Sequence, residues 1–209
     1  MTISRRRIIA GSALLFVSSD ARAAGEANDL IARVGRARAS VRTLQGPFEQ
    51  RRTIGLLATE VRSRGTLILV RPDYLRWELA PPDEVTFWVG PEGLAYRSAH
   101  GHGRAPASST RIGEALDDLR TVLGGDLARL RDRWELRVVR DDPSGAELEA
   151  TPRPGLTARL QRLSFSLASD LARPTRALLV ETPRDHTTIE FGALVTNAPV
   201  DDALMRPSP

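Results

Sequence analysis

Residues 64–82 read RGTLILVRPDYLRWELAPP, and this stretch contains two candidate strands with a turn between them. Residues 64–71 and 75–79 have the apolar and alternating patterns typical of strands. Arg71-Pro72-Asp73 has the composition of a turn. Two strands this close in sequence must be antiparallel, because a parallel pair needs a crossover connection of roughly a dozen residues. The stretch therefore predicts an antiparallel sheet.

The strand pattern continues on both sides of this hairpin. Further strands are predicted at 48–54, 85–89, 94–98, 134–140, 146–151, 158–167, 176–182 and 187–194. Pro81-Pro82-Asp83 and residues 90–93 supply turns between the early strands. Residues 99–109 are expected to form a loop, and the tail from Asn197 onward is expected to be irregular.

Helical spacing replaces the strand pattern in two longer segments. Residues 26–44 place apolar side chains three or four positions apart, and Gly46-Pro47 is expected to end that helix. Residues 112–123 carry a second apolar stripe, and Asp126 can cap a short third helix that runs to Leu130. The stripe consists of Ile112, Leu116, Leu119 and Leu123. This order predicts an α+β protein with one large antiparallel sheet and helices on one of its faces.

The composition describes one ordinary globular domain. The chain has 209 residues, of which 41% are hydrophobic and 27% are charged. It contains no cysteine, which excludes disulfides, thiolate metal sites, a catalytic thiol and a lipid-modified cysteine.

The excess positive charge is concentrated at the start of the chain. Residues 1–23 contain four arginines and one aspartate, so they contribute +3 to the formal net charge of +4, and residues 24–209 carry about +1. The other charges are mixed in sign, and no basic run is interleaved with aromatic side chains. A nucleic-acid partner is therefore not expected.

Residues 1–23 have the three parts of an export signal. Arginines 5–7 form the positively charged n-region, residues 8–17 form an apolar run, and Ala21-Arg22-Ala23 provides a cleavage site. The apolar run is about half the length of roughly 20 residues that a membrane-spanning helix needs. The mature domain is therefore predicted to be 24–209. A serine before paired arginines resembles a twin-arginine signal, while a general secretory signal stays open as the alternative.

The ordered motifs of the chain resemble the LolA family of lipoprotein carriers. The segments that carry the resemblance are Phe48-Glu49-Gln50, Arg64-Gly65-Thr66-Leu67, residues 71–78 followed by Pro81-Pro82, residues 90–96, and residues 187–191 followed by Asn197. Pro91-Glu92-Gly93 and Asp185-His186 depart from the turns of the family. The resemblance covers nearly all of the predicted mature chain.

The resemblance implies a fold and a function. The fold would be an incomplete antiparallel β-barrel, with helices that form a lid over an apolar cavity. The function would be that of a monomeric periplasmic carrier without a cofactor, which moves the acyl chains of lipoproteins from an inner-membrane ABC transporter to an outer-membrane receptor. A LolA-like carrier of another lipid or glycolipid, and a periplasmic lipid-sensing regulator of the same fold, stay open as alternatives.

Alternate residues of a strand share a face, so the apolar side chains of 64–71 and 75–79 can line such a cavity. The expected lining consists of Phe48, Leu67, Leu69, Leu75, Trp77, Leu79, Trp88, Leu116 and Leu119. Ordinary core packing is the alternative for Phe48 and Trp77, and simple helix packing is the alternative for the stripe of residues 112–123. By resemblance, Arg71 would be a gate that bonds to carbonyls of the lid helix and holds the empty cavity shut. A solvated arginine at a strand end is the alternative.

No catalytic or metal site is expected. His100, His102 and His186 could suggest a metal site, but the Gly-flanked loop of His100 and His102 has no nearby carboxylate or cysteine ligand, so solvated histidines are expected. Asp141-Asp142 is interpreted as a turn, and Asp117-Asp118 as a solvated helix face, rather than as acid–base pairs. The sequence has no nucleophile elbow, phosphate-binding loop or zinc-protease motif.

Overall fold

The computed structural model describes residues 17–57, 59–124, 126–156 and 158–207, so most of the predicted export signal lies outside the described residues. Within these residues, twelve antiparallel strands form one sheet in the order β6-β5-β4-β3-β2-β1-β11-β10-β9-β8-β7, with β12 beside β1. The strands are β1 (Thr43–Ile54), β2 (Thr59–Val70), β3 (Tyr74–Leu79), β4 (Val85–Gly90), β5 (Gly93–Ser98), β6 (Gly101–Ala105), β7 (Trp134–Asp142), β8 (Gly145–Pro152), β9 (Arg162–Ala168), β10 (Pro174–Val180), β11 (His186–Phe191) and β12 (Val195–Thr196).

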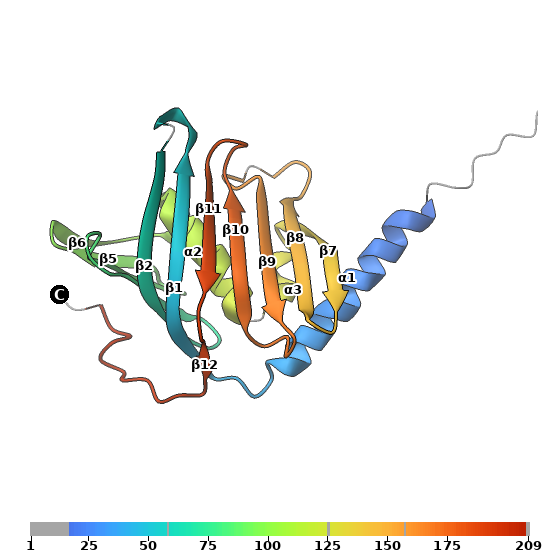
Figure 1. The fold of residues 1–209 in the computed structure, drawn as a ribbon, viewed down its shortest axis with the longest axis horizontal. Coiled ribbons are helices and arrows are strands. Elements are labelled where there is room, and N and C mark those ends of the chain that lie inside the picture. The colour runs from blue at the N-terminus through green and yellow to red at the C-terminus, as the bar shows by residue number, and fades with distance from the viewer. Residues whose placement is uncertain (1–16, 58, 125, 157, 208–209) are drawn as a thin grey trace, which may run out of the picture.

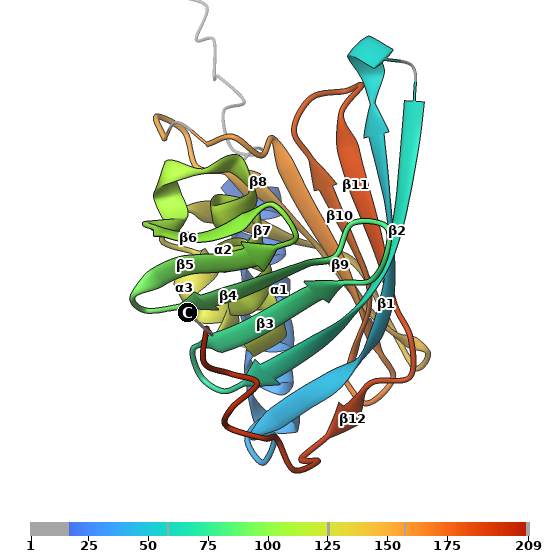
Figure 2. The same ribbon diagram turned by 90° about the vertical axis from the view of Figure 1, so that its left-hand side faces the viewer.

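The sheet is strongly curved and does not close. Its two edge strands, β6 and β7, do not pair with each other. In Figure 2 the strands β3 to β6 run across the direction of β9 to β11, so the sheet wraps around one side of the molecule. The predicted large antiparallel sheet is therefore confirmed, and it is an open sheet.

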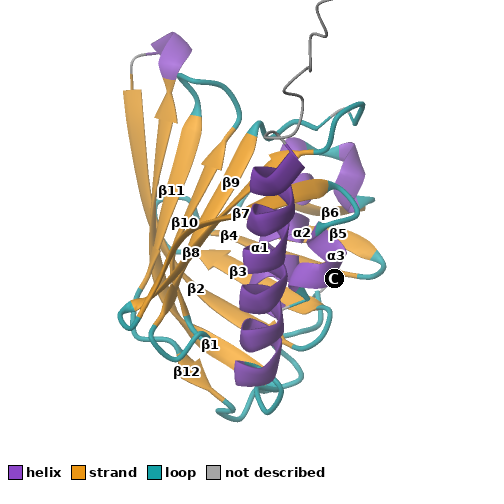
Figure 3. Cartoon of the chain, turned by 90° about the vertical axis from the view of Figure 1, so that its right-hand side faces the viewer, coloured by secondary structure: helices purple, strands orange, loops and turns teal. Residues whose placement is uncertain are grey.

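In the described part of the chain, three α-helices lie on the concave side of the sheet (Figures 2 and 3). They are α1 (Val17–Ala37), α2 (Arg111–Gly124) and α3 (Leu127–Leu130). Short 3-10 helices form part of the connection from β1 to β2, as η1 (Gly55–Leu57), and of the connection from β6 to α2, as η2 (Ala107–Ser109). The side chain of Asp126 accepts a bond from the backbone N–H of Arg129, which confirms the predicted cap of α3. Among the described residues, no helix has both the length and the apolar character to cross a membrane.

The predicted end of the first helix is wrong. The helix ends at Ala37 rather than at residue 44, and Gly46-Pro47 lies inside β1 instead of stopping a helix. Residues 43–47 pair with residues 66–70 of β2. Helical spacing alone cannot reveal this pairing, because strand formation depends on neighbours distant in the sequence.

Three other predicted segments also differ from the structure. The predicted loop 99–109 contains β6, whose glycines and histidine give no apolar alternation, and which forms only by pairing with β5 at the edge of the sheet. The strand predicted at 158–167 begins at Arg162. The strand predicted at 187–194 runs from His186 to Phe191.

The core occupies the concave face of the sheet. Phe48 of β1 stacks on Trp77 of β3 with ring centroids 3.7 Å apart, and Phe191 of β11 meets the same indole edge-on at 6.5 Å. These three rings join strands from both halves of the sheet. They therefore hold the curvature that places α2 over the centre of the face.

Candidate functional site

A cavity of about 310 Å³ lies between α2 and the concave face of the sheet. Its walls are mostly apolar and come from both layers. The apolar lining consists of Trp77, Leu79, Leu179 and Ile189 from the strands, and Ile112, Ala115, Leu116 and Leu119 from α2. An apolar space under a helix can hold hydrocarbon without any polar anchor, because burial alone makes the contact favourable.

The mouth of the cavity carries a rim of polar side chains. The rim residues are Gln50, Arg52, Thr110, Arg111, Glu181 and Thr187. The guanidinium of Arg111 lies 2.9 Å from the carboxylate of Glu181, and that of Arg52 lies 3.7 Å from it. Both arginine side chains are about half exposed, although Glu181 is only 17% exposed, and Arg159 adds a further partly exposed ion pair to Glu114 at 3.0 Å. Partly exposed ion pairs add modest stability, so the N-terminal end of α2 is held less firmly than its C-terminal end.

The C-terminal end of α2 is held by a buried arginine. Arg38, which follows α1, is only 1% exposed. Its Nη1 donates to the carbonyls of Val122 and Leu123 at 2.6 and 3.4 Å, and its Nε donates to the carbonyl of Ala172 at 2.8 Å. Burial, together with the nearby charge of Arg71, lowers the pKa of Arg38 to about 10, so its guanidinium stays charged at neutral pH.

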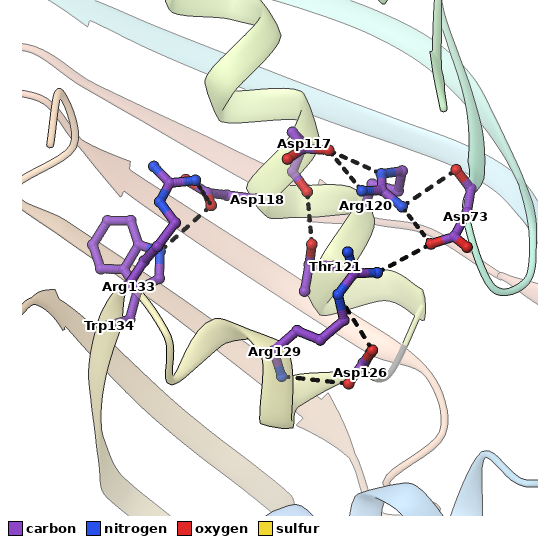
Figure 4. Close-up of polar contacts among 9 residues, drawn as sticks. All are labelled: Asp73, Asp117, Asp118, Arg120, Thr121, Asp126, Arg129, Arg133 and Trp134. Carbon is purple, nitrogen blue, oxygen red and sulfur yellow. Dashed lines mark hydrogen bonds and ion pairs between the residues drawn. The ribbon is translucent and has the colours of Figure 1, made fainter. Parts of the chain in front are cut away.

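A second set of bonds ties the same part of α2 to the sheet (Figure 4). The guanidinium of Arg120 contacts Asp73 at 2.8 Å and Asp117 at 2.7 Å, and Arg129 of α3 contacts Asp73 at 3.2 Å. Asp73 lies in the turn between β2 and β3. The network therefore joins α2, α3 and the sheet at the end of α2 that lies away from the mouth.

Similar structures are known at low sequence identity, although no protein-family model and no curated protein matches the sequence. A DUF1329 family protein from Desulfovibrio piger is 13% identical, with a TM-score of 0.53 over 88% of this chain and 97% of that one. A putative outer membrane lipoprotein-sorting protein domain from Vibrio parahaemolyticus is 10% identical, with a TM-score of 0.50 over 88% of this chain and 100% of that one. The chain has a LolA-like fold.

A further match to this LolA-like fold comes from the MucA/MucB complex of Pseudomonas aeruginosa. The matched chain is 17% identical, with a TM-score of 0.50, and the match covers 87% of this chain and 61% of that one. Identities this low establish the shared fold alone, because one fold serves many functions.

The LolA-like fold brings some of the expected cavity residues together and separates others. Trp77, Leu79, Leu116 and Leu119 line the cavity. Phe48, Leu67, Leu69 and Leu75 are buried in the core that surrounds it. Trp88 lies on the opposite face of β4, because Phe87 is the residue in register with Trp77. Its indole N–H donates to the carbonyl of Leu204 at 2.8 Å.

Several lining residues were not identified from the sequence. Leu179 and Ile189 come from predicted strands, where alternation gives two possible faces and no means of choosing between them. Ile112 belongs to the predicted apolar stripe of α2, and it is partly exposed at the mouth. Nothing in the sequence distinguishes the rim arginines from the others, because arginine occurs throughout the chain.

Arg71 contacts main-chain carbonyls, but those carbonyls belong to the connection between α1 and β1. Its Nη1 donates to the carbonyl of Val41 at 2.9 Å and to that of Arg38. The bonds to α2 come from the side chain of Arg38. Arg38 cannot be singled out from the sequence, because it stands among other arginines, such as Arg33 and Arg36, in a helical pattern that gives all three the same local context.

No cluster of metal-binding side chains was found in the part of the chain that the structure describes. His100 and His102 lie at the hairpin of β5 and β6, and His186 begins β11. The interpretation of Asp117-Asp118 as a solvated helix face is wrong for Asp118, which is only 4% exposed. Asp118 faces the start of β7, where it accepts from the indole N–H of Trp134 at 3.4 Å.

Burial raises the pKa of Asp118 to about 6, although Arg133, at 3.2 Å, and Trp134 both favour the charged form. Asp117 and Glu114 on the same helix add to the rise. The folded state therefore binds this proton more tightly than the unfolded chain. The stabilisation is complete below the unfolded pKa of 3.8 and is lost as the pH rises through about 6.

Replacing Asp118 with asparagine is expected to stabilise the protein by about 1 kcal/mol at pH 7.5 and by almost nothing at pH 4. Asparagine removes the buried charge at high pH, although it also loses the pairing with Arg133. Urea unfolding at both pH values measures the effect. A gain that is equal at the two pH values would contradict the raised pKa.

Proposed function

We propose that this protein is a periplasmic carrier that holds the acyl chains of lipoproteins under α2 and shuttles them from the inner to the outer membrane. The observation that carries the proposal is the apolar cavity between α2 and the concave face of the sheet. A hydrocarbon chain gains about 0.8 kcal/mol for each methylene removed from water. Membranes offer nearly the same gain, so a carrier needs only an apolar space that can open.

The size of the cavity indicates that cargo entry requires movement of α2. A volume of about 310 Å³ lies at the lower end of the range of roughly 300–1,000 Å³ that is typical of small-molecule pockets. The several acyl chains of a lipoprotein anchor need more space. Since the partly exposed ion pairs at the rim hold α2 less firmly than the bonds at its C-terminal end, we infer that the lid opens at the N-terminal end of α2.

The gate of this carrier would combine Arg71 with Arg38. Arg71 bonds to the backbone of Arg38, whose side chain holds the last carbonyls of α2. In the closed form these bonds pair buried guanidinium N–H groups with backbone carbonyls. Leaving such groups unpaired would cost free energy. Opening at the N-terminal end tilts α2 about this anchored end and distorts these bonds, so the closed and open forms become two distinct states whose balance cargo can shift.

Replacing Arg71 with leucine is expected to preserve the fold and to slow release of bound lipid severalfold. The variant loses the bonds that favour the closed, empty form, so the loaded form becomes relatively more stable. Transfer of a fluorescent fatty acid from the protein to acceptor vesicles measures the rate. Release at the rate of the parent protein would contradict the gate role.

The carrier function is tested by the lipid that accompanies the purified protein. The exported chain is purified without detergent, and extracted lipid is identified by mass spectrometry. Ala115 lines the cavity, so an Ala115→Trp variant should fill it and reduce binding of a fluorescent fatty acid at least tenfold. Ala128→Trp, on the exposed side of α3, is the matched control. Absence of extracted lipid together with equal binding by both variants would overturn the proposal.

The resemblance to the LolA family of lipoprotein carriers implies the route and the partners of the proposed carrier. Residues 1–23 would direct export to the periplasm, an inner-membrane ABC transporter would supply the cargo, and an outer-membrane receptor would accept it. No cofactor is needed for this cycle, because the free energy comes from transfer between apolar environments and from the transporter.

A second candidate function is a periplasmic regulator that uses the same cavity to sense lipid. The match to a chain from a complex of two proteins, MucA/MucB, favours it, because a regulator acts through a partner protein. Deletion of the gene distinguishes the candidates. A lipoprotein carrier predicts lipoproteins retained in the inner membrane, and a dedicated carrier of another lipid or glycolipid predicts the loss of one lipid product. A regulator predicts an altered stress response with normal sorting of lipoproteins.

A further inference from the structure

The hairpin of β1 and β2 projects beyond the rest of the sheet, and η1 forms its tip (Figures 1 and 2). On one side, β11 pairs with β1 only as far as Thr53. On the other side, β3 pairs with β2 only from Gly65 onward. The end of the hairpin therefore extends past the neighbouring strands instead of lying within the sheet.

Two leucines are exposed at this tip. Leu56 is 94% exposed and Leu57 is 65% exposed, and both values are higher than those of every other large apolar side chain in the described ranges. Val61, on the adjoining part of β2, is also 40% exposed. Isolated exposed apolar residues are common on protein surfaces, but adjacent leucines at a projecting tip form a patch that marks an interaction site.

The tip is held in place at its base. The backbone N–H of Gly55 donates to the carboxylate of Asp185 at 3.0 Å, and the same carboxylate accepts from the hydroxyl of Thr182. Gly55 also packs so closely on Arg184 that a side chain at this position would overlap it. The turn between β10 and β11 thus supports the tip, so the two leucines are displayed rather than folded back onto the core.

The tip lies at the same end of the molecule as the mouth of the cavity. Arg52 of β1 belongs to the rim and stands close to the tip in sequence, and its partner Glu181 follows β10 next to the supporting turn. A surface that docks through Leu56 and Leu57 would therefore lie against the mouth.

The size and charge of the patch identify its partner as a bilayer. A stable protein interface buries about 800 Å² on each partner, and two leucines on one 3-10 turn provide far less. Shallow insertion into the headgroup region needs only a few apolar side chains. The charges around the tip are balanced, with Arg52, Arg62 and Arg184 beside Glu60, Glu181 and Asp185, so the charged lipid headgroups are not repelled.

We propose that Leu56 and Leu57 insert into the headgroup region of a phospholipid bilayer and thereby place the mouth of the cavity against the membrane. The tip lies outside the cavity, so this docking surface can be tested separately from the binding of cargo.

Co-flotation with vesicles of phosphatidylethanolamine and phosphatidylglycerol tests the docking surface. The Leu56→Gln/Leu57→Gln variant is expected to bind these vesicles about tenfold more weakly than the parent protein. The control Val139→Gln/Val195→Gln changes exposed valines elsewhere on the molecule and should bind normally. Equal binding by all three proteins, or no binding by the parent protein, would overturn the proposal. Unchanged binding of a fluorescent fatty acid by the leucine variant shows that the cavity and the fold are intact.

The absence of cysteine allows a second, site-specific measurement. An environment-sensitive fluorophore on Leu56→Cys should shift to shorter wavelength when vesicles are added. The same fluorophore on Val195→Cys, in β12 at the opposite end of the molecule (Figure 1), should not shift. A shift at both positions or at neither would contradict insertion of the tip, even if the carrier function were established.

Discussion

Replacing Arg38 with methionine is expected to lower the free energy of unfolding by about 3 kcal/mol. The methionine side chain can fill much of the space, but it has no donor for the carbonyls of Val122, Leu123 and Ala172. Two of these carbonyls belong to the last turn of α2, where no intrahelical partner is available. Leaving several carbonyls buried and unpaired outweighs the relief from removing a buried charge near Arg71.

The effect of Arg38→Met should be concentrated in α2. Urea unfolding measures the total loss of stability. Compared with the parent protein, the variant should lose more hydrogen-exchange protection in α2 than in β9 and β10. Arg36→Met, at an exposed position of α1, controls for the loss of one arginine and should change the stability by less than about 0.5 kcal/mol. A similar small change for Arg38→Met would show that the buried guanidinium does not anchor α2.

Replacing Gly65 with alanine is also expected to cost about 3 kcal/mol, near the upper end for overpacking. A Cβ at this position would overlap the backbone carbonyl of Glu78 and would lie 2.5 Å from Cζ of Phe48. Gly65 pairs with Phe48 on one side and with Leu79 on the other, so neither neighbouring strand can move without loss of pairing. The stack of Phe48 on Trp77 would be displaced as well.

Two further variants separate the causes of this effect. Gly35→Ala, in α1, has no atom within 4 Å of the added Cβ, and it should stabilise the protein by up to about 1 kcal/mol through helix propensity. Phe48→Leu combined with Gly65→Ala should recover only part of the loss, since the overlap with the Glu78 carbonyl persists. Full recovery would show that the ring alone excludes a side chain at residue 65.

The sequence correctly predicted those strands whose alternation and turn residues lie close together in the chain. Residues 64–82 contain the second half of β2 and all of β3 around the turn at Asp73, in the predicted antiparallel sense, because both the alternation and the turn residues lie within that stretch. The third helix was predicted for the same reason, since the capping bond of Asp126 reaches only three residues along the chain. The first helix was overextended, because apolar side chains at Val41 and Leu44 fit helical spacing as well as strand pairing.

Of the candidate site, the sequence by itself determined the antiparallel sheet, the apolar stripe of α2 and the strand positions of Trp77 and Leu79. Only the tertiary structure decided that Arg38 holds α2, that Trp88 faces away from the cavity and that Leu56 is exposed. The bond from Arg38 to Ala172 spans 134 residues. Burial and pairing of this kind depend on which distant segments meet, so side chains in the same local pattern can have opposite surroundings.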